Sequence, residues 1–156
     1  DGNLNPLRTT RSLTVEIYNT SGTLINTSTG SVTYSGSQTG VFNGNATLPG
    51  TLSSGNYLVK IKTPYYLRRL LPGFMTLTKG QINNAPETSL IAGDVNNDNT
   101  LTVADYDLIM DCYSDLAPAK NCDANKKAST DISDDGKVNY DDYNLFLREL
   151  SVQIGD

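Results

Sequence analysis

Two stretches in the last third of the chain carry oxygen-bearing side chains at a spacing that binds metal. The first runs from Asp94 to Asp105 and the second from Asp131 to Asp142. Oxygen-bearing side chains stand at the first, third, fifth and twelfth places, and the carbonyl of the seventh residue supplies a further ligand, which is the pattern of a calcium loop. The predicted ligands are Asp94, Asn96, Asp98, Thr100 and Asp105, then Asp131, Ser133, Asp135, Lys137 and Asp142, with Thr100 and Lys137 acting through their carbonyls. The predicted chemistry is therefore the binding of two calcium ions, without catalytic residues.

The two stretches repeat each other at a distance of 37 residues (131 − 94 = 37), which indicates an internal duplication. The sixth place of such a loop needs a sharp turn, and Asn99 and Gly136 allow it. The eighth places hold the apolar Leu101 and Val138. We expect these two residues to pair as a short β-bridge that couples the loops.

Each loop is followed by the pattern of a helix start. Thr102 with Asp105, and Asn139 with Asp142, have the spacing of a cap and the third residue of a helix. Apolar side chains then recur at helical spacing over residues 103–113 and 140–150. These stripes consist of Tyr106, Ile109, Met110 and Tyr113, and of Tyr143, Phe146, Leu147 and Leu150. We expect the two helices to bury these stripes against each other.

The charge of the chain divides near residue 90. Residues 1–90 contain seven basic and three acidic residues, a net of +4, whereas residues 91–156 hold 17 − 3 = 14 acids and 12 − 7 = 5 bases, a net of −9. Repulsion within the acidic part favours a requirement for cations. The chain has no histidine, which excludes Ser-His-Asp and Cys-His catalysis and histidine-bound zinc.

The first part of the chain has the pattern of an antiparallel β module. Leu13, Val15 and Ile17 alternate with polar residues, which predicts a strand with one buried face. The predicted strands are residues 13–18, 23–26, 31–34, 43–48, 57–63, 73–78 and 88–92, separated by turn signals such as Pro49-Gly50 and Pro72-Gly73. We expect a two-domain protein of the β plus α class, with a β-sandwich over residues 1–91.

The stretch LPGTLSSGNYLVKIKTPYYLRRLLPGFMTLTKGQ resembles the extracellular β-sandwiches of the carboxypeptidase regulatory-like and transthyretin-like group. Within it, Tyr65, Tyr66, Arg68 and Arg69 are candidates for a sugar-binding or protein-binding surface. The alternative is an edge strand with solvated charges and half-buried rings, which we favour. The absence of Trp argues against a carbohydrate-binding accessory module, which stays an alternative function.

The arrangement of loop, helix, linker, loop and helix, with Asp closing each loop, resembles a dockerin module over residues 92–156. The resemblance implies a small all-α, non-catalytic module that mediates protein–protein assembly. It implies a cohesin-like partner that contacts the tenth and eleventh loop places and nearby helix residues. Here those places are Val103, Ala104, Tyr140 and Asp141. The alternative is a calcium-stabilised structural cap that packs on its own neighbouring sandwich.

Cys112 and Cys122 form an even pair without histidine or further cysteine to complete a zinc site, so we expect a disulfide. A disulfide and weak calcium sites both indicate an extracellular protein, secreted or at the cell surface. The dockerin resemblance implies a bacterial or archaeal source. We expect neither a membrane span nor a nucleic-acid partner, and the N-terminus lacks the pattern of a signal peptide.

Overall fold

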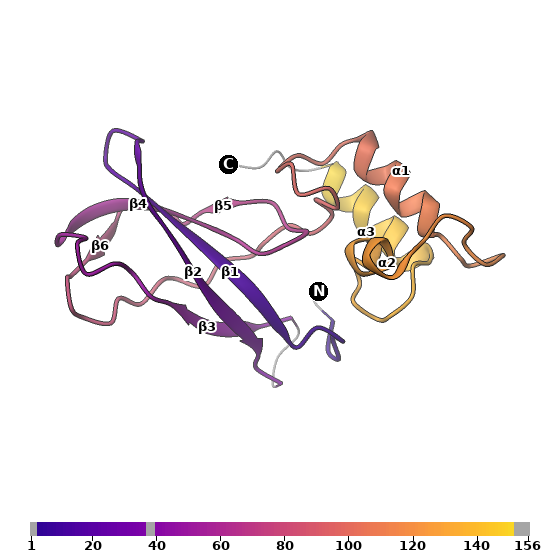
Figure 1. The fold of residues 1–156 in the computed structure, drawn as a ribbon, viewed down its shortest axis with the longest axis horizontal. Helices are drawn as coiled ribbons and strands as arrows, with labels where there is room; N and C mark the ends of the chain where they lie inside the picture. The colour runs from indigo at the N-terminus through magenta and orange to yellow at the C-terminus, as the bar shows by residue number, and fades with distance from the viewer. Residues whose placement is uncertain (1–2, 37–39, 152–156) are drawn as a thin grey trace.

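The computed structural model describes residues 3–36 and 40–151, and consists of an antiparallel sheet followed by three short helices (Figure 1). The strands are β1 (Thr10–Tyr18), β2 (Leu24–Tyr34), β3 (Phe42–Ala46), β4 (Gly55–Lys62), β5 (Arg69–Leu70) and β6 (Met75–Leu77), and the helices are α1 (Val103–Cys112), α2 (Ala124–Thr130) and α3 (Tyr140–Leu150). We refer to residues 3–91 as the sheet half and to residues 92–151 as the helical half. The outer bounds predicted for the two domains, residues 1 and 156, lie outside the described residues.

The strands follow the order β3-β2-β1-β4-β5, and β6 pairs with the first residues of β4. Val15 lies opposite Ile61 and Ile17 opposite Val59, so the apolar faces of β1 and β4 coincide. Val15, Ile17, Val59, Leu71 and Leu77 form the buried cluster of this half. The alternation in β1 and β4 therefore determines which face of the sheet is covered.

Four of the predicted strands differ from the structure, and one strand was not predicted. Residues 23–26 and 31–34 belong to one strand, β2, because its backbone pairs with β1 in continuous register from Asn26 to Thr33, through the polar middle residues. The register shifts once, between the pairs Ile17–Asn26 and Tyr18–Leu24. Residues 88–92 form no strand and contribute a single bridge, between Tyr66 and Ala92. The segment 43–48 leaves the sheet after Ala46, and β5 was not predicted because two residues show no periodicity.

The helices of the helical half begin where the caps predict. Thr102 and Asp105 form a capping box at α1, and Asn139 and Asp142 form the same box at α3. The ring of Tyr106 on α1 lies 6.2 Å from the ring of Tyr143 and 6.4 Å from that of Phe146, both on α3. The two helices therefore bury part of their stripes against each other, as predicted.

A smaller part of the two apolar stripes is buried than the sequence predicts. Ile109 and Phe146 are fully buried, whereas Leu147 and Leu150 are each 39% exposed. Each helix contributes only a few residues to the buried cluster, because loop residues occupy the rest of it. That cluster contains Leu67, Val95, Leu101, Ile109, Cys112, Val138 and Phe146.

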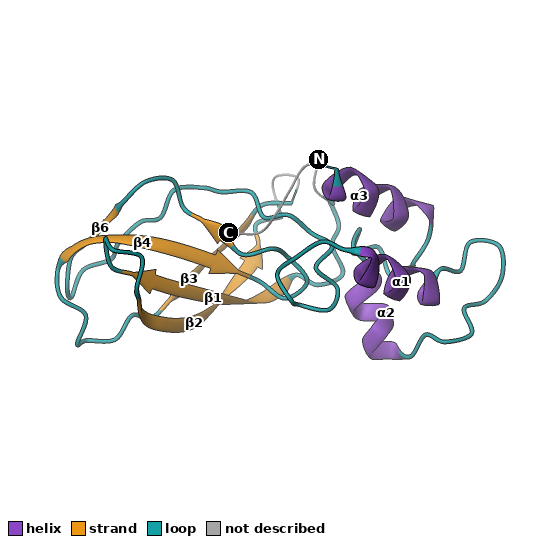
Figure 2. Ribbon diagram, turned by 90° about the horizontal axis from the view of Figure 1, so that it is seen from above, coloured by secondary structure: helices purple, strands orange, loops and turns teal. Residues whose placement is uncertain are grey.

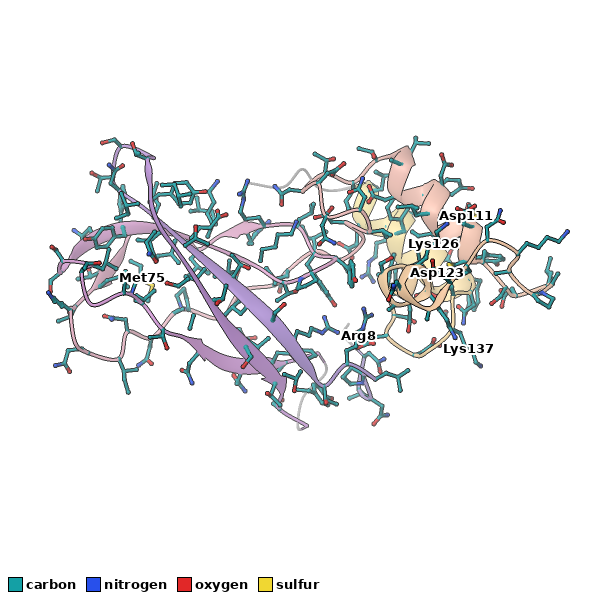
Figure 3. All side chains as sticks on the ribbon, in the orientation of Figure 1. Arg8, Met75, Asp111, Asp123, Lys126 and Lys137 are labelled. Atoms are coloured by element: carbon teal, nitrogen blue, oxygen red, sulfur yellow. A yellow bond between two sulfur atoms is a disulfide. The ribbon has the colours of Figure 1, made fainter. Side chains whose placement is uncertain are left out.

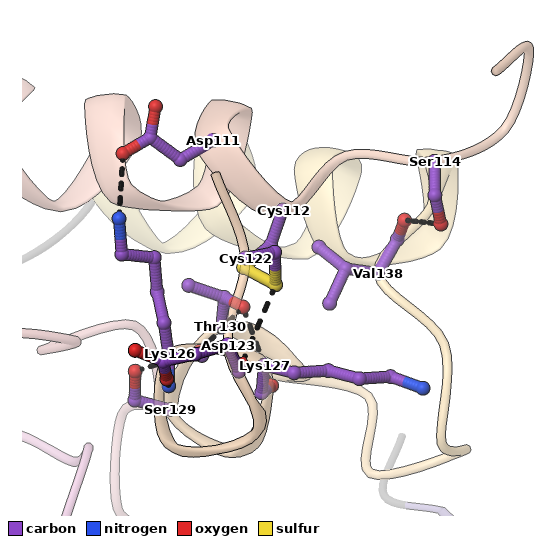
Figure 4. Close-up of a disulfide and its surroundings, with 10 residues drawn as sticks. All are labelled: Asp111, Cys112, Ser114, Cys122, Asp123, Lys126, Lys127, Ser129, Thr130 and Val138. Carbon is purple, nitrogen blue, oxygen red and sulfur yellow. Dashed lines mark hydrogen bonds and ion pairs between the residues drawn. A yellow bond between two sulfur atoms is a disulfide. The ribbon is translucent and has the colours of Figure 1, made fainter. Parts of the chain in front are cut away.

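The segment between α1 and α3 is more ordered than an extended linker. It contains α2, which begins at its cap Asp123, and which the sequence analysis did not predict. The disulfide between Cys112 and Cys122 confirms the predicted pairing and ties this segment to the end of α1 (Figure 4). Lys126 adds an ion pair with Asp111 at 2.8 Å.

The two halves meet end to end, with the helices beyond one end of the sheet (Figures 1 and 2). Leu67, from the sheet half, is 2% exposed and belongs to the buried cluster of the helical half, and Ile91 packs against that cluster. Gly93 has φ 114°, and a Cβ atom there would lie 3.1 Å from the Phe146 ring. The connection therefore passes close to α3 at a position that only glycine fits without strain.

Candidate metal loops

The two predicted loops have the same backbone shape. The fourth residues, Asn97 and Asp134, have φ values of 61° and 58°, and the sixth residues, Asn99 and Gly136, have φ values of 70° and 88°. All four lie in the left-handed region, which costs energy for a residue other than glycine. Because the same turns recur at the same places, the duplication seen in the sequence is also a duplication of structure.

The first carboxylate of each loop accepts hydrogen bonds from the loop itself. The carboxylate of Asp94 accepts the N–H of Asn99 at 3.1 Å, and that of Asp131 accepts the N–H of Gly136 at 2.9 Å. Asp94 is fully buried and Asp131 is 6% exposed. The sixth residue of each loop therefore turns its amide toward the first ligand.

The twelfth carboxylate is held in the same way in both loops. Asp105 accepts the N–H groups of Asn96 (3.2 Å) and Thr102 (2.9 Å). Asp142 accepts those of Ser133 (2.8 Å) and Asn139 (2.9 Å). In each case one bond comes from the third loop residue and the other from the helix cap. Both carboxylates are fully buried.

The fifth carboxylate of each loop accepts a hydrogen bond from the seventh residue. Asp98 accepts the N–H of Thr100 at 2.8 Å, and Asp135 accepts that of Lys137 at 2.8 Å. In the part of the chain that the structure describes, no three acidic or cysteine side chains gather closely enough to hold a metal ion by themselves. The other predicted donors are amide, hydroxyl and carbonyl oxygens, which are ligands suited to a hard cation.

Burial and hydrogen bonds act in opposite directions on the pKa values of the loop carboxylates. Burial raises the pKa of Asp131 and of Asp142, while hydrogen bonds from backbone amides oppose that rise. Hydrogen bonds from Thr100 and Asn96 lower the pKa of the exposed Asp98. The loops thus place buried carboxylates within a segment whose net charge is −9. The residues present fit a calcium ion in each loop.

One expected contact between the loops does not form. Leu101 and Val138 both lie in the buried cluster of the helical half, 9% and 1% exposed. Among the described residues, the isolated β-bridge is the one between Tyr66 and Ala92, so the predicted bridge between the eighth residues is wrong. Packing within the cluster, rather than paired backbone, brings the loops together.

The sheet half contacts both loops, which the sequence analysis did not predict. Lys62 at the end of β4 places Nζ 2.6 Å from the Asp94 carboxylate. Asn97 accepts the N–H of Tyr65 at 2.9 Å. Asp134 forms ion pairs with Arg8 and Arg11 at 2.7 Å and 3.1 Å. The only feature of the sequence that indicates these contacts is the polar residue at the fourth place of each loop, Asn97 or Asp134.

The residues predicted to contact a partner lie at the first turns of α1 and α3. Val103 and Tyr140 are 69% and 57% exposed, and Ala104 and Asp141 are also exposed. Asp141 additionally borders an open groove of about 1030 Å³ between the halves, which is lined by Arg11, Phe42 and Thr63 among others.

The aromatic residues near that groove have partners within the chain. Arg11 lies over the rings of Phe42 (4.4 Å) and Tyr66 (5.0 Å), and Arg8 lies over Tyr65 (5.8 Å). Arg68 forms an ion pair with Glu16 at 3.1 Å. The rings of Tyr65 and Tyr66 are half-buried, as expected from the sequence, but both residues precede the strand β5, and the charge of Arg68 is paired rather than solvated.

No protein-family model matches the sequence, and no curated protein does. Two solved structures are similar in fold. One is a C-terminal interface mutant of a type II cohesin–X-dockerin complex from Acetivibrio cellulolyticus, with a TM-score of 0.51 and 19% identity over 89% of this chain and 80% of that chain. The other is an N-terminal interface mutant of the same type of complex, with a TM-score of 0.50 and 18% identity over the same shares. The likeness is one of fold.

The similarity to these solved structures extends over both halves of the chain. A share of 89% of this chain is larger than either half alone supplies, so the match includes residues of both. The likeness therefore concerns the combination of a sheet and a helical part. Within the described residues, no helix has both the length and the hydrophobicity that crossing a bilayer requires.

Proposed function

We propose that this protein is a non-catalytic, extracellular module that binds two calcium ions and mediates protein–protein assembly through its dockerin-like helical half. The observation that carries the proposal is the identity of shape in the two loops. Each surrounds buried carboxylates with the same hydrogen bonds and left-handed turns, in a segment whose net charge is −9. Oxygen ligands at this spacing suit calcium.

The calcium sites are tested by calorimetric titration of the protein after chelation. The wild-type protein is expected to take up two ions, and the double variant Asp94→Ala, Asp131→Ala is expected to take up none. The control is Asp107→Ala, because Asp107 is an exposed acid on α1 outside both loops, and its removal makes a charge change of the same kind. Equal uptake by the wild-type protein and the double variant would refute the proposal.

The proposed partner surface lies at the starts of α1 and α3. Val103 and Tyr140 are large, exposed and apolar or aromatic, which is the character of residues that anchor protein interfaces. The fold likeness to chains from cohesin–X-dockerin complexes supports a protein partner of the cohesin kind. We therefore assign the assembly role to this surface, with Ala104 and Asp141 beside it.

A binding measurement with a purified type II cohesin tests the partner. Calcium-loaded wild-type protein is expected to bind, and the variants Val103→Asp and Tyr140→Asp are expected to bind at least tenfold more weakly. Lys79→Asp, in the sheet half, serves as the control. Unchanged binding by both surface variants would exclude this surface.

A second function, a calcium-stabilised cap of a larger surface protein, is favoured by the contacts between the halves. Leu67 is buried among residues of the helical half, and Lys62 and Arg8 reach the two loops. If calcium stabilises the wild-type protein and no cohesin binds, the cap function is preferred to the assembly function. The extracellular location is supported by the disulfide, which persists in oxidising surroundings.

A further inference from the structure

We propose that Arg8, through Asp134, positions the second loop for calcium, so that the sheet half controls the affinity of that loop. This inference rests on the proposed function, because it concerns calcium at Asp131–Asp142. Asp134 occupies the fourth place of the loop, which supplies no ligand in the calcium pattern. Its role is therefore separate from coordination.

The segment that precedes β1 is tied to the second loop by backbone and side-chain bonds. The N–H of Leu7 donates to the carbonyl of Asp134 at 3.1 Å, and the N–H of Arg8 donates to its carboxylate at 3.1 Å. Asn3 donates to the carbonyls of Ser133 (2.8 Å) and Asp134 (3.0 Å). A Cβ atom on Gly136 would lie 2.7 Å from the Leu7 side chain.

The guanidinium of Arg8 connects three points of the helical half. Its Nε donates to the carboxylate of Asp134 at 2.7 Å, and its two terminal nitrogens donate to the carbonyls of Ala128 (2.6 Å) and Asp131 (2.5 Å). Figure 3 shows Arg8 between the end of the sheet and the helical half. A planar group with several fixed donors holds such a geometry, which a lysine cannot reproduce.

The carboxylate of Asp134 depends on these partners. It is 2% exposed and pairs with Arg8 and Arg11, and a buried charge without its partner is strongly destabilising. Asp134 also has a left-handed backbone, φ 58°, which the surrounding contacts must maintain. The arginines therefore hold the turn that contains Ser133, the predicted ligand at the third place, and that follows Asp131, the predicted ligand at the first place.

The same contacts link calcium to the docking of the two halves. If holding the turn favours calcium, then calcium must favour the docked segment by the same factor, because binding free energies are reciprocal. Partners that orient metal ligands typically change metal affinity by roughly 10- to 100-fold when they are mutated. We expect an effect at the lower end of that range, because Arg8 bonds the carbonyl of Asp131 and the carboxylate of Asp134, and neither is a predicted ligand atom.

The sign of the effect distinguishes positioning from charge. Removing a positive charge close to a calcium site raises affinity if the charge merely repels the ion. Positioning predicts the opposite. Arg8→Gln is expected to lower the calcium affinity of the second loop about tenfold, and Arg8→Lys, which keeps the charge but not the fork of donors, is expected to lower it as well. Lys127→Gln, at an exposed residue of α2, is the matched control and is expected to leave affinity unchanged or slightly raised.

Amide exchange followed by NMR, measured on the whole 156-residue chain, provides the second readout. Calcium is expected to slow exchange at Leu7 and Arg8 in the wild type, and this protection is expected to be lost in Arg8→Gln, while the amide of Val15 in β1 stays unchanged. A wild-type protein that takes up no calcium contradicts the proposed function and this inference with it. A wild type with two sites, together with Arg8 variants whose affinity equals or exceeds that of Lys127→Gln, contradicts this inference alone.

Discussion

Asn97 and Asp134 occupy the same place in the two loops, and each is held by the sheet half through its side chain. Their φ values differ by three degrees (61° − 58° = 3°). Asn97 accepts the backbone N–H of Tyr65, whereas Asp134 accepts the backbone N–H of Arg8 and also forms ion pairs with the side chains of Arg8 and Arg11. The loops are therefore alike in shape and different in how they are anchored, so their calcium affinities should be separable.

Single substitutions of the first ligands should remove the sites one at a time. Asp94→Ala is expected to leave one calcium site, in the second loop, and Asp131→Ala is expected to leave one site, in the first. The reason is that each buried carboxylate contributes a charged ligand that a methyl group cannot replace. Calorimetry gives the stoichiometry. Two sites in either variant would show that the first place is not a ligand there.

Lys62→Met should strengthen calcium binding in the first loop. The ammonium of Lys62 lies 2.6 Å from the Asp94 carboxylate, so it repels an ion bound to the same carboxylate. Relief of about 1 kcal/mol corresponds to roughly a fivefold gain in affinity. Without calcium, the variant should be less stable than the wild type, because Asp94 is then buried without its counter-ion. Affinity from titration and melting in chelator test the two parts, and weaker binding would contradict the first.

The parts of the fold that were predictable depend on residues close together in sequence. The capping residues Thr102 and Asn139 mark the helix starts, because the cap and its bonds span three or four residues. The alternation in β1 shows its buried face. The disulfide was predictable because Cys112 and Cys122 are close in the sequence and no histidine or further cysteine is present to form a zinc site with them. Local chemistry was sufficient in each case.

The parts that were missed depend on contacts between distant residues. Arg8 reaches Asp134 across 126 positions, and nothing in its surroundings in the sequence distinguishes it from a solvated arginine. Leu67 carries no periodic signal that assigns it to the helical half. The helix α2 has no apolar stripe, and its position is maintained by the disulfide and by Lys126. Tertiary context determines each of these features.

Opening the disulfide should destabilise the helical half. Cys122→Ser is expected to lower the free energy of unfolding by about 3 kcal/mol, because the bond closes a short loop and restricts the unfolded chain. Intact-mass measurement should first show that reduction of the wild-type protein adds two hydrogens. Two thiols that react without reduction would contradict the disulfide. The calcium-loaded variant should melt earlier than the wild type, and Ser114→Ala, in the same linker, is the comparison for a change without loss of the bond.

Removal of calcium should unfold the helical half before the sheet half. The two buried clusters are distinct, since Val15, Ile17 and Val59 belong to one and Ile109 and Phe146 to the other. Calcium bound in the proposed sites would stabilise the folded helical half by mass action, whereas the cluster under the sheet contains none of the proposed ligands. Chelation is therefore expected to reduce the helical circular-dichroism signal of α1 and α3 while the β signal persists, giving two transitions on heating.

The contacts between the sheet half and the helical half determine how independently the two halves unfold. Leu67→Ala should weaken the helical half by about 2–5 kcal/mol, because it empties a fully packed position. It should leave the melting of the sheet close to that of the wild type, whereas Val59→Ala should lower the sheet transition instead. If chelation removes both signals in one transition, then Leu67 and the ion pairs of Arg8 and Lys62 join the halves into one cooperative unit. The cap function would then account for the molecule better than an independent assembly module.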